Sequence, residues 1–199
     1  MNTQTKESLS SMTPERALEM LKEGHQRFVA SRQGNRDLLE QVQATSDGQY
    51  PFAVVLGCVD SRVPLEIIFD QGIGDIFGVR IAGNNINEDI LGSMEFACQV
   101  VGSKHILVLG HTSCGAIKGA VGKVELGNLT QLLEKFQPAI DAAGPDATVD
   151  DIAAANVRLT VDAIQAQSPT LKALVDGGTL SISGAMYDVA SGEISFDIA

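Results

Sequence analysis

Two short apolar runs constrain the fold of this chain more than any other feature. Residues 53–57 read AVVLG, and residues 106–110 read ILVLG. Each run is apolar at every position before its glycine, which is typical of a strand that is buried on both faces of a parallel sheet. Because such sheets carry helices on both faces, we predict an α/β fold with a mainly parallel central β-sheet flanked by helices.

Metal-binding side chains follow both runs. Cys58 comes directly after the first run, His111 directly after the second, and Cys114 three residues later. Ligands of open α/β sheets bind at the carboxyl ends of the strands, so these side chains meet if the two strands are neighbours. Two thiolates and one imidazole favour zinc, and this donor set with one open position recurs in catalytic zinc sites. Cys114 is expected to open a helix whose dipole lowers the pKa of its thiol.

A fourth cysteine or histidine ligand is not expected. Cys98 falls in a predicted amphipathic helix, where a small buried thiol is the ordinary interpretation. His105 opens a predicted strand and His25 lies in the predicted N-terminal helix, so we interpret both as structural histidines. The fourth metal position is therefore left to water or a carboxylate, as in a catalytic zinc site.

Asp60 is the carboxylate nearest to the predicted metal, and Arg62 follows two residues later. The guanidinium can hold the carboxylate in a bidentate pair. If Arg62 keeps Asp60, the metal retains an open position for hydroxide, whereas a released Asp60 can coordinate the metal and close the site. Two thiolates cancel the charge of zinc and make it a weaker Lewis acid than a three-histidine site, which predicts a basic pH preference.

Length, charge and cysteine content narrow the class of function. The 199 residues with 44% hydrophobic content suffice for one core, so we predict a single domain over residues 1–199. A formal net charge of −11 argues against nucleic acid and anionic membrane as partners, since both bind basic surfaces. The polar N-terminus and the absence of a long apolar run predict no signal peptide and no membrane span. Three cysteines, two of them assigned to metal, fit a reducing compartment, and we expect a cytoplasmic location.

The remaining segments are predicted from their periodicity. Residues 1–12 read as a mobile tail, and residues 13–45 as a helical arm with Thr13 as its cap and Pro14 at the first helical position. The apolar stripe of this arm predicts packing outside its own core. Residues 126–136 and 150–167 read as helices that cover the sheet, the second ended by Ser168 and Pro169. Residues 180–183 alternate as a strand, and residues 187–196 contain a turn, which together predict a C-terminal edge hairpin.

The order C-x-D-x-R followed by H-x-x-C, with this spacing, resembles the β-class carbonic anhydrases. The resemblance runs from about residue 17 to residue 121. It includes the segments DSRVP at 60–64, FDQG at 69–72, RIAGN at 80–84 and LGSME at 91–95. The C-terminal third resembles the family only loosely.

The resemblance implies a function and a role for each site residue. Cys58, His111 and Cys114 would bind zinc, and Asp60 and Arg62 would orient a zinc-bound hydroxide. The implied reaction is the reversible hydration of carbon dioxide to bicarbonate and a proton, by attack of that hydroxide on carbon. Gln49 matches the substrate-binding glutamine of the family, and Phe77 matches an aromatic wall of the same small pocket.

Further positions refine the resemblance. Phe96 stands where many members have a tyrosine, so a hydroxyl that could contact substrate is lost. Val55 stands where some members carry the tryptophan of a regulatory bicarbonate site, and the chain has no tryptophan. This implies the type that lacks the regulatory site. In the family, N-terminal helices wrap around a partner subunit, which implies a homodimer or homotetramer over the arm at 13–45. Gln49 and Phe77 could then serve the zinc of the partner.

Three other functions stay open from the sequence. A zinc hydrolase of carbon disulfide or carbonyl sulfide would use the same ligands, because a linear triatomic substrate fits the same pocket. A non-catalytic zinc-binding protein is less well supported, since a structural site rarely needs a dyad such as Asp60 and Arg62. A thiol redox protein is disfavoured because the chain contains no C-x-x-C.

Overall fold

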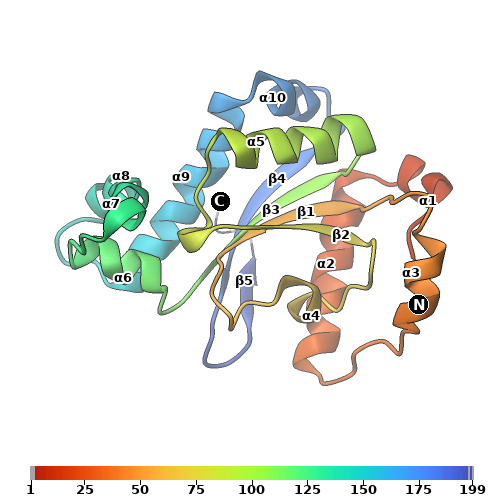
Figure 1. Ribbon diagram of the computed structural model, residues 1–199, viewed down its shortest axis with the longest axis horizontal. Coiled ribbons are helices and arrows are strands. Elements are labelled where there is room, and N and C mark those ends of the chain that lie inside the picture. Colours follow the sequence, from red (N-terminus) through yellow and green to blue (C-terminus); the bar gives the residue numbers. More distant parts are fainter. Residues whose placement is uncertain (1–2, 197, 199) are drawn as a thin grey trace.

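A five-stranded sheet forms the centre of the molecule. The computed structural model describes residues 3–196 and 198. The strands lie in the order β2-β1-β3-β4-β5, in which the first four are parallel and β5 runs antiparallel to β4 (Figure 1). Their bounds are β1 (Ala53–Gly57), β2 (Ile76–Arg80), β3 (His105–His111), β4 (Ser181–Tyr187) and β5 (Ile194–Phe196). The predicted α/β fold and its C-terminal edge hairpin are confirmed.

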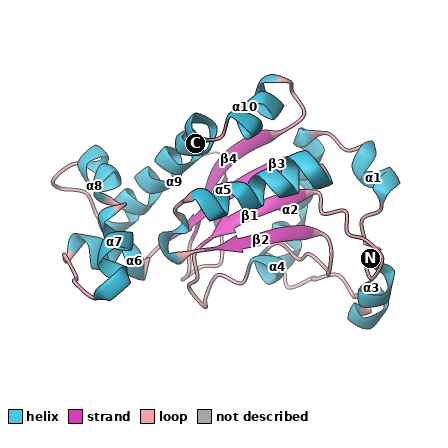
Figure 2. Cartoon of the chain, turned by 45° about the horizontal axis from the view of Figure 1, so that its top comes forward, coloured by secondary structure: helices cyan, strands magenta, loops and turns pink. Residues whose placement is uncertain are grey.

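Helices cover both faces of this sheet, as Figure 2 shows. Helices α2 and α4 pack on one face, and α5, η2, α9 and α10 pack on the other. Helices α6 to α8 gather at one end of the molecule, beyond the carboxyl end of β3 (Figure 1). The bounds are α1 (Lys6–Ser10), α2 (Pro14–Val29), α3 (Leu38–Ala44), α4 (Leu65–Ile68), η1 (Ala82–Asn84), α5 (Glu88–Glu95), η2 (Phe96–Val101), α6 (Gly115–Val121), α7 (Gly127–Glu134), α8 (Gln137–Ala143), α9 (Val149–Gln167) and α10 (Pro169–Asp176). None of the helices in the described part of the chain is long and apolar enough to cross a membrane.

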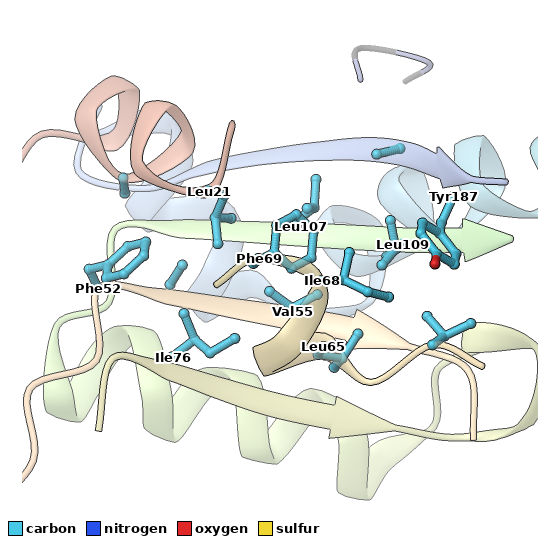
Figure 3. Packing of buried hydrophobic residues seen from close by; sticks show 14 of the residues in the cluster. Leu21, Phe52, Val55, Leu65, Ile68, Phe69, Ile76, Leu107, Leu109 and Tyr187 are labelled. Carbon is cyan, nitrogen blue, oxygen red and sulfur yellow. The ribbon is translucent and has the colours of Figure 1, made fainter. Parts of the chain in front are cut away.

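The central strands are buried on both faces because alternate residues enter different clusters. Val55 and Leu107 pack with Leu21 of α2 and Phe69, which follows α4, on one face (Figure 3). Val54, Leu56, Ile106 and Val108 join the cluster on the other face, beneath α5 and α9. Every residue of β1 and β3 is buried, as the apolar runs predicted.

Residues 6–10 differ from the mobile tail that was predicted for residues 1–12. Residues 6–10 form α1, whose N-terminus is capped by the side chain of Thr5. Leu9 on this helix is buried in the same cluster as α2. The short helix forms because it can bury this one leucine against the core. The polar composition of the segment does not indicate such a tertiary contact. Residues 1 and 2 lie outside the described part of the chain.

In the helical arm, the predicted start of the first helix is confirmed, but the predicted packing of its apolar stripe is not. Thr13 caps α2 and Pro14 is its first residue. The apolar stripe packs on the sheet of its own chain, where Ala17 and Leu21 are fully buried. The prediction that this stripe packs outside its own core is therefore wrong for α2. The exposed apolar side chains of the arm lie instead on α3, at Leu38, Leu39 and Val42.

Two helices, α8 and α10, begin at positions where the sequence predicted no helix. Ser168 and Pro169 do end α9, but Ser168 also caps α10, its hydroxyl accepting from the N–H of Leu171. Proline at the first helical position starts a helix as readily as it ends the one before it. In the same way α8 begins just before Pro138. The α5 helix continues into a π-helical turn, η2, which ends at Gly102 with φ at +99°.

The buried carboxylate of Asp70 ties the arm to the segment between α4 and β2. The Asp70 side chain is only 2% exposed and accepts hydrogen bonds from Arg27, Arg36 and the backbone N–H of Gly34. Burial by itself raises the pKa of Asp70, but the hydrogen bonds from the two guanidinium groups and from Gly34 lower it by more. The carboxylate therefore stays ionised in the folded protein.

We expect Asp70→Asn to lower the free energy of unfolding by about 3–5 kcal/mol, because it leaves the nearly buried Arg36 without its carboxylate. In the wild type this stabilisation is present above about pH 4 and is lost as the pH falls through the depressed folded-state pKa. Urea unfolding at one protein concentration, repeated over a series of pH values, measures the loss in the variant and the pH dependence in the wild type. Asp176→Asn, which breaks an exposed pair with Lys172, is the matched control and should change the free energy of unfolding by about 0.5 kcal/mol or less. A loss of the same size in both variants would contradict this role of Asp70.

Candidate metal centre

The three predicted metal ligands converge at the carboxyl ends of two neighbouring strands. Strands β1 and β3 are adjacent and parallel, with Gly57 beside Leu109, so Cys58 and His111 emerge at the same edge. Cys114 is the N-cap residue of α6, one short loop after His111. The sulfur atoms of both cysteines and a ring nitrogen of His111 lie within 4.8 Å of one another, and all three residues are buried. This group could hold a metal ion.

His111 is oriented to offer one nitrogen to that group. Its Nδ1 lies 2.9 Å from the carbonyl oxygen of Thr112, and because a carbonyl only accepts, Nδ1 carries the proton. The lone pair of the neutral ring is then on Nε2. Nε2 is buried and has no hydrogen-bond partner among the described residues. An unpartnered buried nitrogen beside two thiols fits a metal ligand, with the Thr112 carbonyl fixing the ring as outer partners of zinc-binding histidines do.

The loop between His111 and Cys114 is held by neighbouring elements. Ser113 has a φ of +56°, and its N–H donates to a carboxylate oxygen of Asp150 at 2.7 Å. The N–H of Thr112 donates to the carbonyl oxygen of Tyr187 at the end of β4. These contacts turn the chain sharply enough to bring Cys114 back toward His111.

The two thiols share one proton in the metal-free protein. A hydrogen bond from Cys114 lowers the pKa of Cys58 to about 4, with a smaller contribution from the backbone N–H of Gly83, against the opposing effect of burial. The same hydrogen bond, together with burial, raises the pKa of Cys114 far above its usual value. The prediction of a lowered pKa for Cys114 is therefore wrong for the metal-free site, because the neighbouring thiolate outweighs the N–H groups of α6. Binding a metal to both sulfurs must release this proton.

Arg62 holds Asp60 in the predicted bidentate pair. Nε of Arg62 donates to one carboxylate oxygen at 2.9 Å and Nη2 donates to the other at 2.7 Å. Nη2 also lies 3.3 Å from the carbonyl oxygen of Ser113, in the ligand loop. These hydrogen bonds hold the pKa of the Asp60 carboxyl well below its usual range, so it is ionised at neutral pH. Its Oδ2 lies 3.9 Å from Nε2 of His111, at the border of the metal group.

Gln49 and Phe77 do not lie beside the metal group of their own chain. Gln49 precedes β1, whereas Cys58 follows it, and a strand of this length spans about 16 Å. Phe77 pairs with Val54 near the amino end of β1 and contacts the ring of Phe96, with 6.3 Å between the ring centroids. The chain therefore separates the predicted substrate residues from the predicted ligands.

The other cysteine and the other two histidines do not join the metal group. Cys98 is buried in η2, and burial raises the pKa of its thiol to about 12. His25 lies with Nδ1 3.3 Å from the carbonyl oxygen of Ile68. His105 is bonded on both ring nitrogens, to Ser181 at 2.7 Å and to Ser183 at 3.1 Å.

Sequence reasoning missed three residues that shape the centre. The N–H of Gly83 donates to the sulfur of Cys58 at 3.2 Å. Arg80 donates to the carbonyl oxygens of Cys58 and Asp60, at 2.9 and 2.7 Å, and so fixes the loop that carries both. Asp150 holds Ser113 from the start of α9. Among the sequence features, only the RIAGN segment at 80–84 could have indicated Gly83 and Arg80.

Comparison with known proteins assigns the chain to a family. A family model described as carbonic anhydrase matches residues 53–194, which include all three residues of the metal group. The chain belongs to the carbonic anhydrase family. Carbonic anhydrase 2 of Mycobacterium tuberculosis is 38% identical over 192 residues, covering 92% of this chain and 93% of the relative. The carbonic anhydrase of Mycolicibacterium smegmatis is also 38% identical, covering 94% of both chains.

Solved structures identify the class of this carbonic anhydrase. The β-carbonic anhydrase CafA of Aspergillus fumigatus superposes with a TM-score of 0.72 at 29% identity, covering 93% of this chain and 91% of the other. The β-carbonic anhydrase CcaA gives a TM-score of 0.72 at 28% identity, covering 90% of this chain and 94% of the other. This carbonic anhydrase therefore belongs to the β class, as the C-x-D-x-R and H-x-x-C segments implied.

Proposed function

We propose that this carbonic anhydrase is a zinc enzyme that hydrates carbon dioxide reversibly, with Cys58, His111 and Cys114 as the zinc ligands. The observation that carries the proposal is the convergence of three buried donor atoms within 4.8 Å beside a carboxylate that Arg62 holds. Zinc fits this donor set because it accepts soft thiolates and imidazole together. When bound, zinc lowers the pKa of water so that hydroxide is available near neutral pH.

Asp60 positions the nucleophile in this proposal. Its carboxylate is ionised and accepts three hydrogen bonds from Arg62, two from the guanidinium and one from the backbone N–H, which leaves a lone pair on Oδ2 to accept the hydrogen of the attacking hydroxide. A hydroxide held in this way presents a lone pair to the carbon of carbon dioxide. Arg62 is itself tied to the ligand loop through the carbonyl oxygen of Ser113, so the dyad and the metal ligands keep a common geometry.

The substrate is tested by stopped-flow hydration of carbon dioxide with a pH indicator, on protein of known zinc content. The same preparation is then tested for release of sulfide from carbon disulfide and carbonyl sulfide. We expect rapid proton release from carbon dioxide and a far lower rate with the sulfur compounds. A zinc-loaded protein that is inactive toward carbon dioxide at neutral and alkaline pH, and active toward carbon disulfide, would overturn the proposal.

We further propose that the active unit is at least a homodimer, in which Gln49 and Phe77 serve the metal centre of the partner subunit. Two observations support this. Gln49 lies at the opposite end of β1 from Cys58 within one chain. The arm exposes Leu38, Leu39 and Val42 on α3, the last of these 48% exposed, and apolar side chains grouped in this way favour a protein contact. A small-molecule substrate and a second copy of the chain are thus the partners proposed.

Mixed dimers test which chain Gln49 serves. Gln49→Ala and Asp60→Asn subunits with different affinity tags are co-expressed, and the doubly tagged dimer is purified. If Gln49 serves the partner, one of the two sites has both residues intact and the mixed dimer keeps about half of the wild-type activity, as two-fold symmetry requires. If Gln49 serves its own chain, both sites are defective and no activity returns, which would refute the proposed exchange. Pure dimers of each variant are the controls.

Two finer properties also belong to the proposal. Cys58 and Cys114 must stay reduced to bind zinc, which favours a reducing compartment, and we propose a cytoplasmic location. Val55 is fully buried in β1, where some members of the family have the tryptophan of a regulatory bicarbonate site. We therefore assign the chain to the type without that site.

A further inference from the structure

Asn156 is a buried amide that reaches the metal centre through one residue. It lies in the middle of α9 and is only 5% exposed. Its Nδ2 donates to the carbonyl oxygen of Gly83 at 3.0 Å. The N–H of the same Gly83 donates to the sulfur of Cys58 at 3.2 Å. Asn156 stands 73 positions along the chain from Gly83 and outside every metal-binding segment.

Gly83 occupies a turn whose shape depends on its surroundings. It has a φ of +69° and is followed by Asn84 with a φ of +45°, so two successive residues are in the left-handed region. A Cβ at Gly83 would lie 2.3 Å from Cζ of Phe136 and 3.2 Å from Cβ of Ala116. Glycine is therefore required here both for its backbone angle and for the lack of a side chain. Packing holds one side of the turn, and Asn156 binds the carbonyl that projects from it.

We propose that Asn156 is a positioning residue for the metal centre, which holds the backbone of Gly83 so that its N–H donates to the sulfur of Cys58. This inference rests on the proposed zinc ligation by Cys58. Gly83 links its N–H to its carbonyl through only two rotatable bonds, so fixing the carbonyl restricts the direction of the N–H. Without Asn156 the turn keeps its packing but loses the contact that fixes this direction.

The hydrogen bond from Gly83 to the sulfur of Cys58 affects how strongly a metal between two thiolates acts as a Lewis acid. Two sulfurs neutralise a divalent ion and weaken it as a Lewis acid. An N–H that donates to one sulfur draws negative charge away from the metal, and outer hydrogen bonds of this kind tune metal sites and hold their ligands in place. Asn156 thereby opposes the loss of Lewis acidity that the second thiolate causes.

The test uses Asn156→Leu, which fills most of the volume without a donor, and Asn156→Ala, beside Thr160→Val as control. Thr160 is buried one turn further along the same face of α9. In cobalt-substituted protein, we expect the sulfur-to-cobalt charge-transfer band of both Asn156 variants to move to lower energy, because the sulfur becomes a stronger donor. The rate of zinc transfer to a chelator should nevertheless rise by about 10- to 100-fold, because Cys58 is no longer held in place for the metal. Thr160→Val should match the wild type in both measurements.

A second measurement needs no substitution and covers the case in which the Asn156 variants do not fold. In wild-type protein loaded with ¹¹³Cd, we expect the amide proton of Gly83 to show a scalar coupling to cadmium through the N–H···S bond. Absence of that coupling, or Asn156 variants with the wild-type cobalt spectrum and wild-type zinc retention, would overturn the inference. A wild type that binds neither zinc nor cobalt at Cys58 would instead refute the zinc proposal on which it rests.

Discussion

Replacing Asp60 with asparagine is expected to lower kcat/KM for carbon dioxide hydration by about 10²- to 10⁴-fold while zinc content stays unchanged. The carboxylate accepts both hydrogen bonds from the guanidinium of Arg62 and, in the proposed mechanism, also accepts the hydrogen of the attacking hydroxide. An amide of the same shape has only one oxygen acceptor and adds two N–H donors, so it repels the guanidinium and misaligns the nucleophile. Stopped-flow hydration on zinc-quantified protein measures the loss.

Asp176→Asn is the control for Asp60→Asn. Asp176 also pairs with a cation, Lys172, but it is exposed at the end of α10 and far along the chain from the metal ligands. This variant should keep wild-type activity. An Asp60→Asn enzyme that binds zinc and retains wild-type kcat/KM across neutral and alkaline pH would show that the dyad does not act on the nucleophile.

The second large effect is expected from the ligands themselves. Cys58→Ser and Cys114→Ser should each reduce zinc from about one ion per chain to near zero and abolish hydration, because a serine hydroxyl is a harder ligand that does not ionise as a thiol does. Metal analysis after dialysis against a weak chelator measures the content. Activity is measured on the same samples.

Cys98→Ser makes the same atomic exchange at the third cysteine. Its thiol is buried in η2, and burial raises its pKa to about 12, so it has no tendency to become a thiolate ligand. This variant should keep its zinc and its activity. Zinc that survives in both ligand variants, or is lost equally in Cys98→Ser, would contradict the assignment of Cys58 and Cys114.

The metal group was predictable because its geometry is local to two strands. Cys58 and His111 each follow an apolar run that indicates a buried strand. Parallel neighbouring strands end at the same edge of a sheet. Asp60 and Arg62 are two residues apart, so their hydrogen bonds also form within one loop. Patterns of this kind depend on few residues, so they can be interpreted without knowledge of the rest of the fold.

The features that were missed depend on contacts between distant segments. Asn156 meets Gly83 only because α9 packs across the face of the sheet next to η1. The pKa of Cys114 was expected to fall because its position in α6 was considered alone, whereas the neighbouring thiolate of Cys58 decides it. The apolar stripe of α2 indicated that this face of the helix is buried. Periodicity does not indicate whether it packs on its own chain or on a partner.

Titration of zinc into metal-free protein, with carbon dioxide hydration measured at each step, tests the central claim most directly. We predict that activity rises in proportion to added zinc and reaches a plateau at about one ion per chain, since one Cys-His-Cys group is found in the described part of the chain. Protein that binds zinc at this ratio through Cys58, His111 and Cys114 and still does not hydrate carbon dioxide would contradict the account.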